Sequence, residues 1–259
     1  MSIDQHKAIL QQLDFERRTN YVQSRARSES AIVRDISSDG GLCEIVFSSS
    51  APDEVDQLIA LETQRARSAG YTLEWKVYGH DSPQSLSDRL IEAGFQPQSR
   101  EAFMVATIDQ KLLDAFGEPT ADIREITTAS YLANYRTVRE SVSGEDCTAE
   151  MERYASLFAT SPRNMSVYVA YVADDPAACG RLYCCDGSKF AALYGGQTIE
   201  KHRRQGLYTQ LTAIRLREAM SKGFPYAFVD AMPTSEPILA KRGFERITFV
   251  QAFILDPFS

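Results

Sequence analysis

Arg203-Arg204-Gln205-Gly206-Leu207-Tyr208 is the stretch of this chain that most strongly indicates its fold. It follows an apolar, strand-like run over residues 190–199 and opens a helix-like run over residues 207–222. A basic, glycine-containing turn between a strand and a helix brings free backbone N–H groups and the positive end of the helix to one place. The sequence therefore predicts a binding site for a phosphate or pyrophosphate at this turn.

Acidic residues are distributed unevenly along the chain, which has 259 residues and a net charge of −7. Residues 1–118 hold 12 Lys and Arg against 19 Asp and Glu, whereas residues 119–259 hold 16 of each. The excess of acid argues against a nucleic-acid partner, because phosphate contacts dominate the affinity for nucleic acids. The neutral second part of the chain is the better host for an anionic ligand.

Neither the hydrophobic pattern nor the cysteines point to a membrane or a metal. No apolar run approaches the roughly 18–20 residues of a membrane helix, and the N-terminus lacks the pattern of a signal peptide. We therefore expect a cytoplasmic protein without a membrane partner. The five cysteines include no C-x-x-C pair and the three histidines are scattered, so we expect no disulfide framework and no metal site.

Periodicity and turn residues predict an α/β (α+β) protein. The predicted helices span residues 3–28, 53–68, 83–93, 129–140, 149–158, 207–222 and 235–241. The predicted strands span residues 31–36, 42–47, 73–78, 123–126, 166–172, 179–185, 190–199 and 227–231, with extended runs over 95–108 and 244–255. Gly117-Glu118-Pro119-Thr120 interrupts this pattern and is the predicted linker between domains 1–118 and 119–259.

The two halves of the chain repeat one order of elements. Gly70 precedes a predicted strand, a predicted helix and Gly94-Phe95. In the second half, a predicted strand and helix lead in the same order to Gly243-Phe244. Each Gly-Phe pair runs into an apolar extended segment. Agreement in order and spacing favours an internal duplication, with chance similarity as the alternative.

The second half resembles the GNAT superfamily of N-acetyltransferases. The signature of that family is R/Q-x-x-G-x-G/A between a strand and a helix. Arg203-x-x-Gly206-x-Tyr208 matches it except at the last position, where Tyr208 replaces a small residue. The Gly-Phe at residues 243–244 matches the Gly-Phe with which family members end a later short helix.

The first half resembles the family only in outline. It keeps the Gly-Phe at residues 94–95, but residues 47–52 stand where the basic turn would be. The resemblance implies two GNAT-like domains, each with a mixed, mostly antiparallel central sheet flanked by helices. Only the second of them would be competent.

The resemblance also implies that acetyl-CoA is the cosubstrate and that the basic turn holds its pyrophosphate. A solvated basic helix start is the alternative interpretation of the turn, and a helix N-cap is the alternative for Ser235. The implied cofactor-binding residues are Thr198, Ile199, Arg203, Arg204, Gln205, Gly206, Leu207, Tyr208 and Ser235.

Gly195-Gly196 lies inside a strand-like run, where glycine often marks a bulge or the close approach of another backbone. GNAT enzymes carry a bulge on this strand, which pairs with the pantetheine arm and directs a backbone N–H to the thioester carbonyl. The resemblance therefore makes the backbone N–H of Gly196 a candidate oxyanion donor. A simple kink of the strand is the alternative.

The residues that would move protons are less clear. Many GNAT enzymes place a Tyr four residues before the Gly of Gly-Phe, and Leu239 occupies that position here. Tyr208 is a candidate substitute, with a packing role as the alternative. Glu140, Glu145 and Asp146 are candidate groups at the mouth of an amine site, with solvated surface charge as the alternative.

These observations predict an acetyl-CoA-dependent N-acetyltransferase, a monomer or homodimer. It would move the acetyl group to the amine of a small molecule or peptide by direct attack on the thioester. A non-catalytic acyl-CoA-binding or regulatory module of the same fold is the alternative. Transfer of another acyl group, or transfer to oxygen, is a third reading. The acidic first half favours a cationic acceptor.

Overall fold

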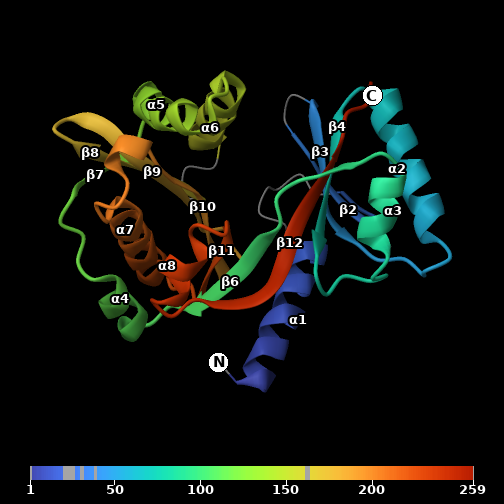
Figure 1. The fold of residues 1–259 in the computed structure, drawn as a ribbon, viewed down its shortest axis with the longest axis horizontal. Coiled ribbons are helices and arrows are strands. Elements are labelled where there is room, and N and C mark those ends of the chain that lie inside the picture. The colour runs from blue at the N-terminus through green and yellow to red at the C-terminus, as the bar shows by residue number, and fades with distance from the viewer. Residues whose placement is uncertain (1, 20–26, 30–31, 38–39, 161–163, 259) are drawn as a thin grey trace. The chain divides into compact units, whose positions relative to one another are not determined.

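A computed structural model of the chain describes residues 2–19, 27–29, 32–37, 40–160 and 164–258. The fold is mixed α/β, with helices flanking strands that are mostly antiparallel (Figure 1). None of the helices in these ranges is long and apolar enough to cross a bilayer.

The chain divides into two compact units. The first consists of residues 1–104, 230–236 and 246–259. The second consists of residues 105–229 and 237–245. Each unit is built from separate segments of the chain. The predicted division into two continuous domains, 1–118 and 119–259, stays a prediction.

The first unit contains a sheet with the strand order β1-β2-β3-β4-β12. β3 and β4 are parallel, and the other neighbouring pairs are antiparallel. The chain then passes through β6 (Glu101–Thr107) into the second unit. The strands are β1 (Arg27–Glu29), β2 (Ile32–Ile36), β3 (Leu42–Ser48), β4 (Thr72–Tyr78), β12 (Glu245–Leu255) and the short β5 (Gln96–Pro97), which pairs with β12.

The helices that the structure describes in the first unit are α1 (Ile3–Thr19), α2 (Val55–Ala69) and α3 (Leu86–Glu92). α2 is the crossover that the parallel pair β3–β4 requires. It ends at Gly70, whose φ of 75° allows its N–H to bond the carbonyl of Ala66. Residues of α2, α3 and one face of the sheet form a core around Leu73, Trp75 and Phe95. Figure 1 shows α2 and α3 beside the strands of this sheet.

The second unit contains a sheet with the order β11-β10-β9-β8-β7. β10 and β11 are parallel, and the remaining pairs are antiparallel. Its strands are β7 (Asp122–Ile126), β8 (Met165–Val172), β9 (Asp175–Tyr183), β10 (Phe190–Thr198) and β11 (Tyr226–Ala231), which reaches the boundary of the unit. Its helices are α4 (Gln110–Phe116), α5 (Leu132–Ser143), α6 (Thr148–Thr160), α7 (Leu207–Ser221) and α8 (Glu236–Ala240), with short 3₁₀ turns at Ala129–Tyr131 and Glu200–His202.

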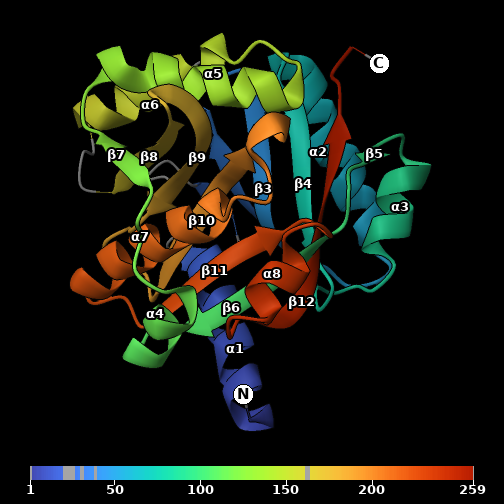
Figure 2. The same cartoon turned by 60° about the vertical axis from the view of Figure 1, so that its left-hand side comes forward.

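Two layers of helices cover the sheet of the second unit. α5 and α6 lie over one face of β8–β10, and α7 lies over the other (Figures 1 and 2). Because successive residues of a strand point to opposite faces, β10 presents alternate positions to α5 and to α7. This arrangement places the residues of the candidate site.

The predicted repeat is present in three dimensions. In the first unit β3, α2 and β4 form a parallel pair with a helical crossover, and in the second unit β10, α7 and β11 form the same motif. A short helix follows each motif, and the phenylalanine after it is buried, with Phe95 1% and Phe244 2% exposed. The shared order of elements is therefore confirmed.

The predicted elements depart from the structure at three places. The strand predicted over residues 179–185 is β9, which begins at Asp175 and ends at Tyr183, so Cys184 and Cys185 lie outside it. The helix predicted over residues 3–28 ends at Thr19, and residues 27–29 pair with β2, so the prediction is wrong for residues 27–28. Its residues 20–26 lie outside the described part. The short helix α4 was not predicted, although Asp109 caps it by accepting a hydrogen bond of 2.8 Å from the Leu112 amide.

The last strand of the chain belongs to the first unit. β12 runs antiparallel to β4, with Val250 opposite Tyr78 and Leu255 opposite Leu73. Phe253 on this strand is 1% exposed and belongs to the core around Trp75. The first unit therefore includes a strand that follows the second unit in the sequence.

Candidate functional site

The basic turn lies between β10 and α7, as the sequence predicts. A 3₁₀ turn ends at His202, Arg203 is extended, and α7 begins at Leu207. Residues 203–206 are exposed. The first N–H groups of a helix have no partner within the helix, and they coincide here with two arginines. The turn therefore presents a positively charged helix end to solvent.

The backbone of the turn has the conformation of an anion-binding concavity. Arg204 has φ of 63° and Gly206 has φ of 79°, so two residues of the turn are left-handed. A non-glycine residue in this conformation costs about 1–2 kcal/mol. Left-handed residues within a turn direct successive N–H groups to one side, which makes a nest for an anion.

The strand before the turn contains a bulge. The register between β9 and β10 shifts between Tyr194 and Gln197, and Gly195 has φ of 59°. The predicted irregularity at Gly195-Gly196 is thus present as a bulge. The two glycines face opposite sides of the sheet, as neighbours on a strand do.

Each glycine of the bulge makes room for a large side chain. A Cβ atom on Gly195 would lie 2.8 Å from Tyr135 Oη of α5. On the other face, a Cβ atom on Gly196 would lie 2.8 Å from Tyr208 Cε2 of α7 and 3.5 Å from Arg215 Nη2. Any other residue at either position would displace these side chains. Tyr208 therefore packs against the backbone of the bulge.

Several buried polar atoms around the bulge and turn have no hydrogen-bond partner among the described residues: Tyr135 Oη, Arg181 Nε, Gln197 Oε1, Thr198 Oγ1 and His202 Nε2. Buried polar groups are normally paired, so such a concentration requires an explanation. A ligand that carries amides and phosphates along β10 and into the turn would pair with them. The residues present therefore fit a coenzyme A moiety.

The other predicted cofactor residues have local roles in the structure. Arg203 Nε donates to the carbonyl of Thr198 at 3.3 Å, which closes the turn onto β10. Ile199 begins the 3₁₀ turn and its N–H bonds the carbonyl of Ala177. Ser235 belongs to the first unit, where its hydroxyl donates to the carbonyl of Met232 at 3.1 Å.

The position of the usual catalytic Tyr holds a leucine, and two of the candidate carboxylates already accept hydrogen bonds. Leu239 is fully buried. Glu140 accepts hydrogen bonds from Arg136 and from the Cys147 amide, and Asp146 accepts from Arg136. These bonds tie the end of α5 to the start of α6. The structure therefore gives two of the three predicted carboxylates a place in a loop network.

A second network, which sequence reasoning missed, lies beneath the bulge on the side of α5. Arg181 Nη1 of β9 donates to Glu150 Oε1 at 2.8 Å, and Arg139 Nε donates to Glu150 Oε2 at 3.0 Å. The Tyr154 hydroxyl also bonds Glu150, and burial raises the pKa of Tyr135 above its usual range. These residues come from three separate elements, so no local motif announces them.

Arg215 is the second residue that the sequence analysis missed. It is 1% exposed and donates to the carbonyl oxygens of Arg181 at 3.0 Å and Tyr194 at 3.3 Å. A Cβ on Gly180 would lie 2.8 Å from Arg215 Cζ, so this glycine makes room for the guanidinium. Burial lowers the pKa of Arg215. Its position among the apolar residues of α7, next to Leu216, was the signal in the sequence that could have identified it as buried.

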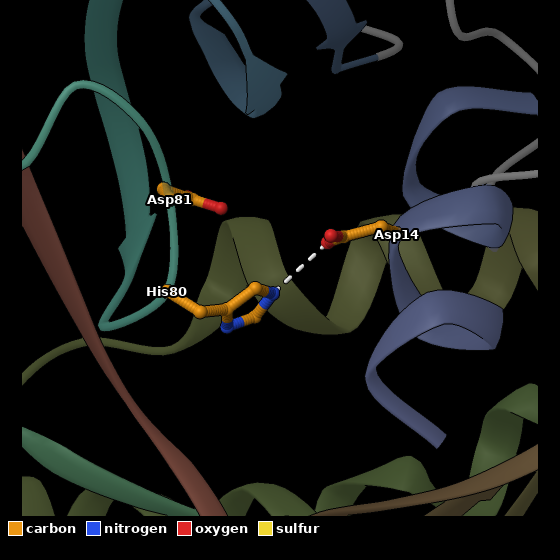
Figure 3. Close-up of side chains that lie close together, drawn as sticks. All are labelled: Asp14, His80 and Asp81. Carbon is orange, nitrogen blue, oxygen red and sulfur yellow. Dashed lines mark hydrogen bonds and ion pairs between the residues drawn. The ribbon is translucent and has the colours of Figure 1, made fainter. Parts of the chain in front are cut away.

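A further cluster of chemistry-bearing side chains lies in the first unit. Asp14, His80 and Asp81 place their ligand atoms within 4.8 Å of one another (Figure 3). Arg17 lies among them, with Nη1 and Nη2 at 2.7 and 2.8 Å from the two Asp81 oxygens, and with Nη1 at 3.0 Å from Asp14 Oδ1. The guanidinium supplies the positive charge that the carboxylates require. The cluster is therefore an ion-pair network that joins α1 to the loop after β4.

Electrostatics within this network favour the charged forms. Burial raises the pKa of Asp14, but the His80 hydrogen bond at 3.0 Å and the charge of Arg17 outweigh it, and the pKa falls below its usual range. The pKa of Arg17 is raised, since its bonds to Asp81 outweigh the effect of burial. Arg17 also lies over the Tyr78 ring, 4.0 Å from its centroid.

Comparison with known proteins identifies the fold. No protein-family model and no curated protein matches the chain. The structure is similar to a functionally unknown conserved protein from Staphylococcus epidermidis ATCC 12228, at 15% identity and a TM-score of 0.69, over 92% of this chain and 96% of that chain. It is also similar to a GCN5-related N-acetyltransferase from Kribbella flavida, at 17% identity and a TM-score of 0.65, over 98% and 96%.

A third solved structure bears on the arrangement of the two units. A tandem GNAT protein from the clavulanic acid biosynthesis pathway matches at 14% identity and a TM-score of 0.59, over 95% of this chain and 87% of that chain. The chain therefore has the fold of the GNAT superfamily in a tandem arrangement.

Replacing Arg17 with methionine should lower the free energy of unfolding by about 3–5 kcal/mol, because it leaves the buried Asp81 carboxylate without its partner. The side chains of Arg17 and Asp81 are 2% and 4% exposed. Urea denaturation measures this change. The control is Arg89→Met, which removes an exposed, solvent-screened pair with Glu92 and should change the free energy of unfolding far less. Equal losses in both variants would contradict the network.

Replacing Gly195 with alanine should destabilise the protein by about 1–3 kcal/mol, beyond the strain of a positive φ, because the new methyl group overlaps Tyr135 Oη. Gly144→Ala is the matched control, since Gly144 has φ of 74° and no atom lies within 4 Å of the place that a Cβ would take. In a Tyr135→Phe background the cost of Gly195→Ala should fall. Thermal denaturation of the four variants measures the coupling, and additive costs would show that the two residues do not touch.

Proposed function

We propose that this protein is an acetyl-CoA-dependent N-acetyltransferase that acetylates the amine of a small molecule or peptide. The observation that carries the proposal is the left-handed, doubly basic turn at the start of α7, which directly follows the bulged strand β10. The fold of the neighbouring structures supports the class of reaction, and the site residues support the donor.

The turn would hold the pyrophosphate. Arg203 and Arg204 are exposed beside the N–H groups of Leu207 and Tyr208, so an anion there would meet both a helix end and two guanidinium groups. One such helix-end interaction contributes only about 0.3–1 kcal/mol. Binding therefore requires the nest and both arginines together.

The bulge would orient the reacting group. When bound, acetyl-CoA supplies an acetyl group already activated as a thioester. Gly196 allows close approach to the strand backbone, and its N–H is the candidate oxyanion donor. Arg215 lies beneath the same residue, so its buried positive charge favours negative charge that develops at the bulge.

Proton transfer requires further groups. An alkyl amine with a pKa of about 10.4 must lose a proton before it attacks, and the leaving thiolate must gain one. Tyr208 packs on Gly196 and stays the candidate acid, since no other predicted acid lies at the bulge among the described residues. Glu140 and Asp146 hold Arg136 and are poor candidates for a free base.

A non-catalytic module that binds acyl-CoA is the second candidate. The observation that favours it is the fully buried Leu239 at the position where many GNAT enzymes have a catalytic Tyr. The two candidates share the same donor site. They differ in whether an amine accelerates release of free coenzyme A.

Titration calorimetry with acetyl-CoA tests the donor site. We expect the wild type to bind, and the Arg203→Ala, Arg204→Ala double variant to bind at least about tenfold more weakly, which is a loss of about 1.4 kcal/mol. The matched control is Arg217→Ala, which removes an arginine from the middle of α7 that pairs with the exposed Glu118. Folded protein without affinity for acetyl-CoA would overturn the proposal.

Thiol release in the presence of an amine panel separates the two candidate functions. Release above the rate of hydrolysis supports the transferase, and Tyr208→Phe should then lower kcat more than it raises KM if Tyr208 protonates the leaving group. Binding of acetyl-CoA without amine-dependent release would instead support the non-catalytic module.

A further inference from the structure

Acidic side chains gather on the sheet face of the first unit that points away from α2 and α3. Leu73 and Trp75 of β4 face the core, so Glu74 and Lys76, which alternate with them, face the other side. Glu44 of β3 is the register partner of Glu74. Two carboxyl groups and one ammonium group therefore share this face.

Two further carboxyl groups complete the group. Lys76 Nζ donates to Asp230 Oδ2 at 2.7 Å. Glu101, at the start of β6, lies close enough to Asp230, Lys76 and Glu74 for their charges to act on its pKa. We call Glu44, Glu74, Lys76, Glu101 and Asp230 the acidic cluster; it has four acids and one base.

One carboxylate oxygen of the acidic cluster has no hydrogen-bond donor among the described residues. The side chain of Asp230 is only 7% exposed, and its Oδ1 is buried without a hydrogen-bond partner among the described residues. A buried carboxylate oxygen is normally paired, because desolvation without a bond is costly. Asp81, by contrast, has both oxygens bonded to Arg17. The charged groups that shift the pKa of Glu101 are Asp230, Lys76 and Glu74, and none of them is an arginine.

The pKa values of two carboxyl groups in the acidic cluster are raised by burial and by the neighbouring negative charges. Burial and the neighbouring Glu44 raise the pKa of Glu74 to about 7. Burial and Asp230 raise the pKa of Glu101 to about 7 as well. Lys76 opposes both shifts without cancelling them. An added positive charge would therefore be favoured here.

The spacing of the carboxyl groups points to an organic cation rather than a metal ion. Among the described residues, Asp14, His80 and Asp81 alone form a group of three or more acidic, His or Cys residues with ligand atoms within 4.8 Å. The oxygens of the acidic cluster are therefore too far apart for three of them to chelate one ion. A ligand with N–H donors on a carbon chain spans such distances.

We propose that the acidic cluster is a binding site for an organic ammonium ion, which donates a hydrogen bond to Asp230 Oδ1 and pairs with the carboxylates of Glu101 and Glu74. An alkyl diamine is the simplest ligand of this chemistry. The proposal does not rest on acetyl transfer, and its test contains no acetyl-CoA. Failure of one proposal therefore leaves the other intact.

Titration calorimetry of the full chain with 1,4-diaminobutane tests the site, with uncharged 1,4-butanediol as the control ligand. We expect the diamine alone to bind. Glu101→Gln and Asp230→Asn should each weaken its affinity at least about tenfold, since each removes a charged partner. Glu92→Gln is the matched control, because it removes an exposed carboxylate of α3 and should leave the affinity unchanged.

Two variants are used so that a loss of binding can be distinguished from a loss of folding. Asp230→Asn removes the partner of Lys76, whereas the Glu101 side chain makes no hydrogen bond or ion pair among the described residues, so Glu101→Gln is the milder change. Circular dichroism establishes that each variant is folded. Absence of diamine binding to the folded wild type, equal affinity in Glu101→Gln and Glu92→Gln, or tighter binding of Mg²⁺ than of the diamine would overturn the proposal.

Proton release gives an independent readout. A bound ammonium ion favours ionised carboxyl groups, so it lowers the pKa of Glu74 and Glu101 from about 7 and protons leave on binding at pH 7. Affinity should therefore rise between pH 6 and pH 8. Tyr78, which also faces Lys76 and Asp230, has a pKa of about 12 and stays neutral over this range. Binding enthalpies in phosphate and Tris buffers measure the release, and an affinity independent of pH would contradict the site.

Discussion

The absence of a side chain at three glycines is the constraint on which the candidate donor site depends. Gly180, Gly195 and Gly196 each leave space that a side-chain group of another residue fills, at 2.8 Å from where a Cβ atom would be. Arg215, Tyr135 and Tyr208 are the residues concerned. Because the three contacts converge on β9 and β10 beside the bulge, the strand backbone, both helix layers and the basic turn form one connected arrangement.

The two units share one structural motif but differ in the charge at the start of its helix. Both have a parallel strand pair with a helical crossover, and both bury a phenylalanine after the next short helix. α7 begins after two arginines and a left-handed glycine, whereas α2 follows Asp53 and Glu54 and carries Asp56 in its first turn. Carboxylates at the start of α2 disfavour an anion there, so the charge pattern proposed to bind a phosphate at α7 is not repeated at α2.

Much of the fold was predictable because it follows from local chemistry. The turn, the bulge glycines and the buried phenylalanines were all visible as short patterns, and α2 ends at the glycine that the pattern indicated. The exceptions have physical reasons. Residues 27–29 join a strand because β2 supplies their hydrogen bonds, and the seven-residue α4 is too short for a clear helical period. Two of the three carboxylates predicted at the mouth of an amine site, Glu140 and Asp146, pair with Arg136, a partner that periodicity does not reveal.

The sequence by itself determined the basic turn Arg203–Tyr208, because glycine, arginine and a helix start act through the backbone within a few residues. Only the tertiary structure decided what surrounds it. Tyr135, Arg181 and Arg215 meet at the bulge from three elements. The acidic cluster likewise joins residues as distant as Glu44 and Asp230, and its charge excess arises from burial on a sheet face. Such interactions depend on distance and solvent exposure, which the order of residues does not contain.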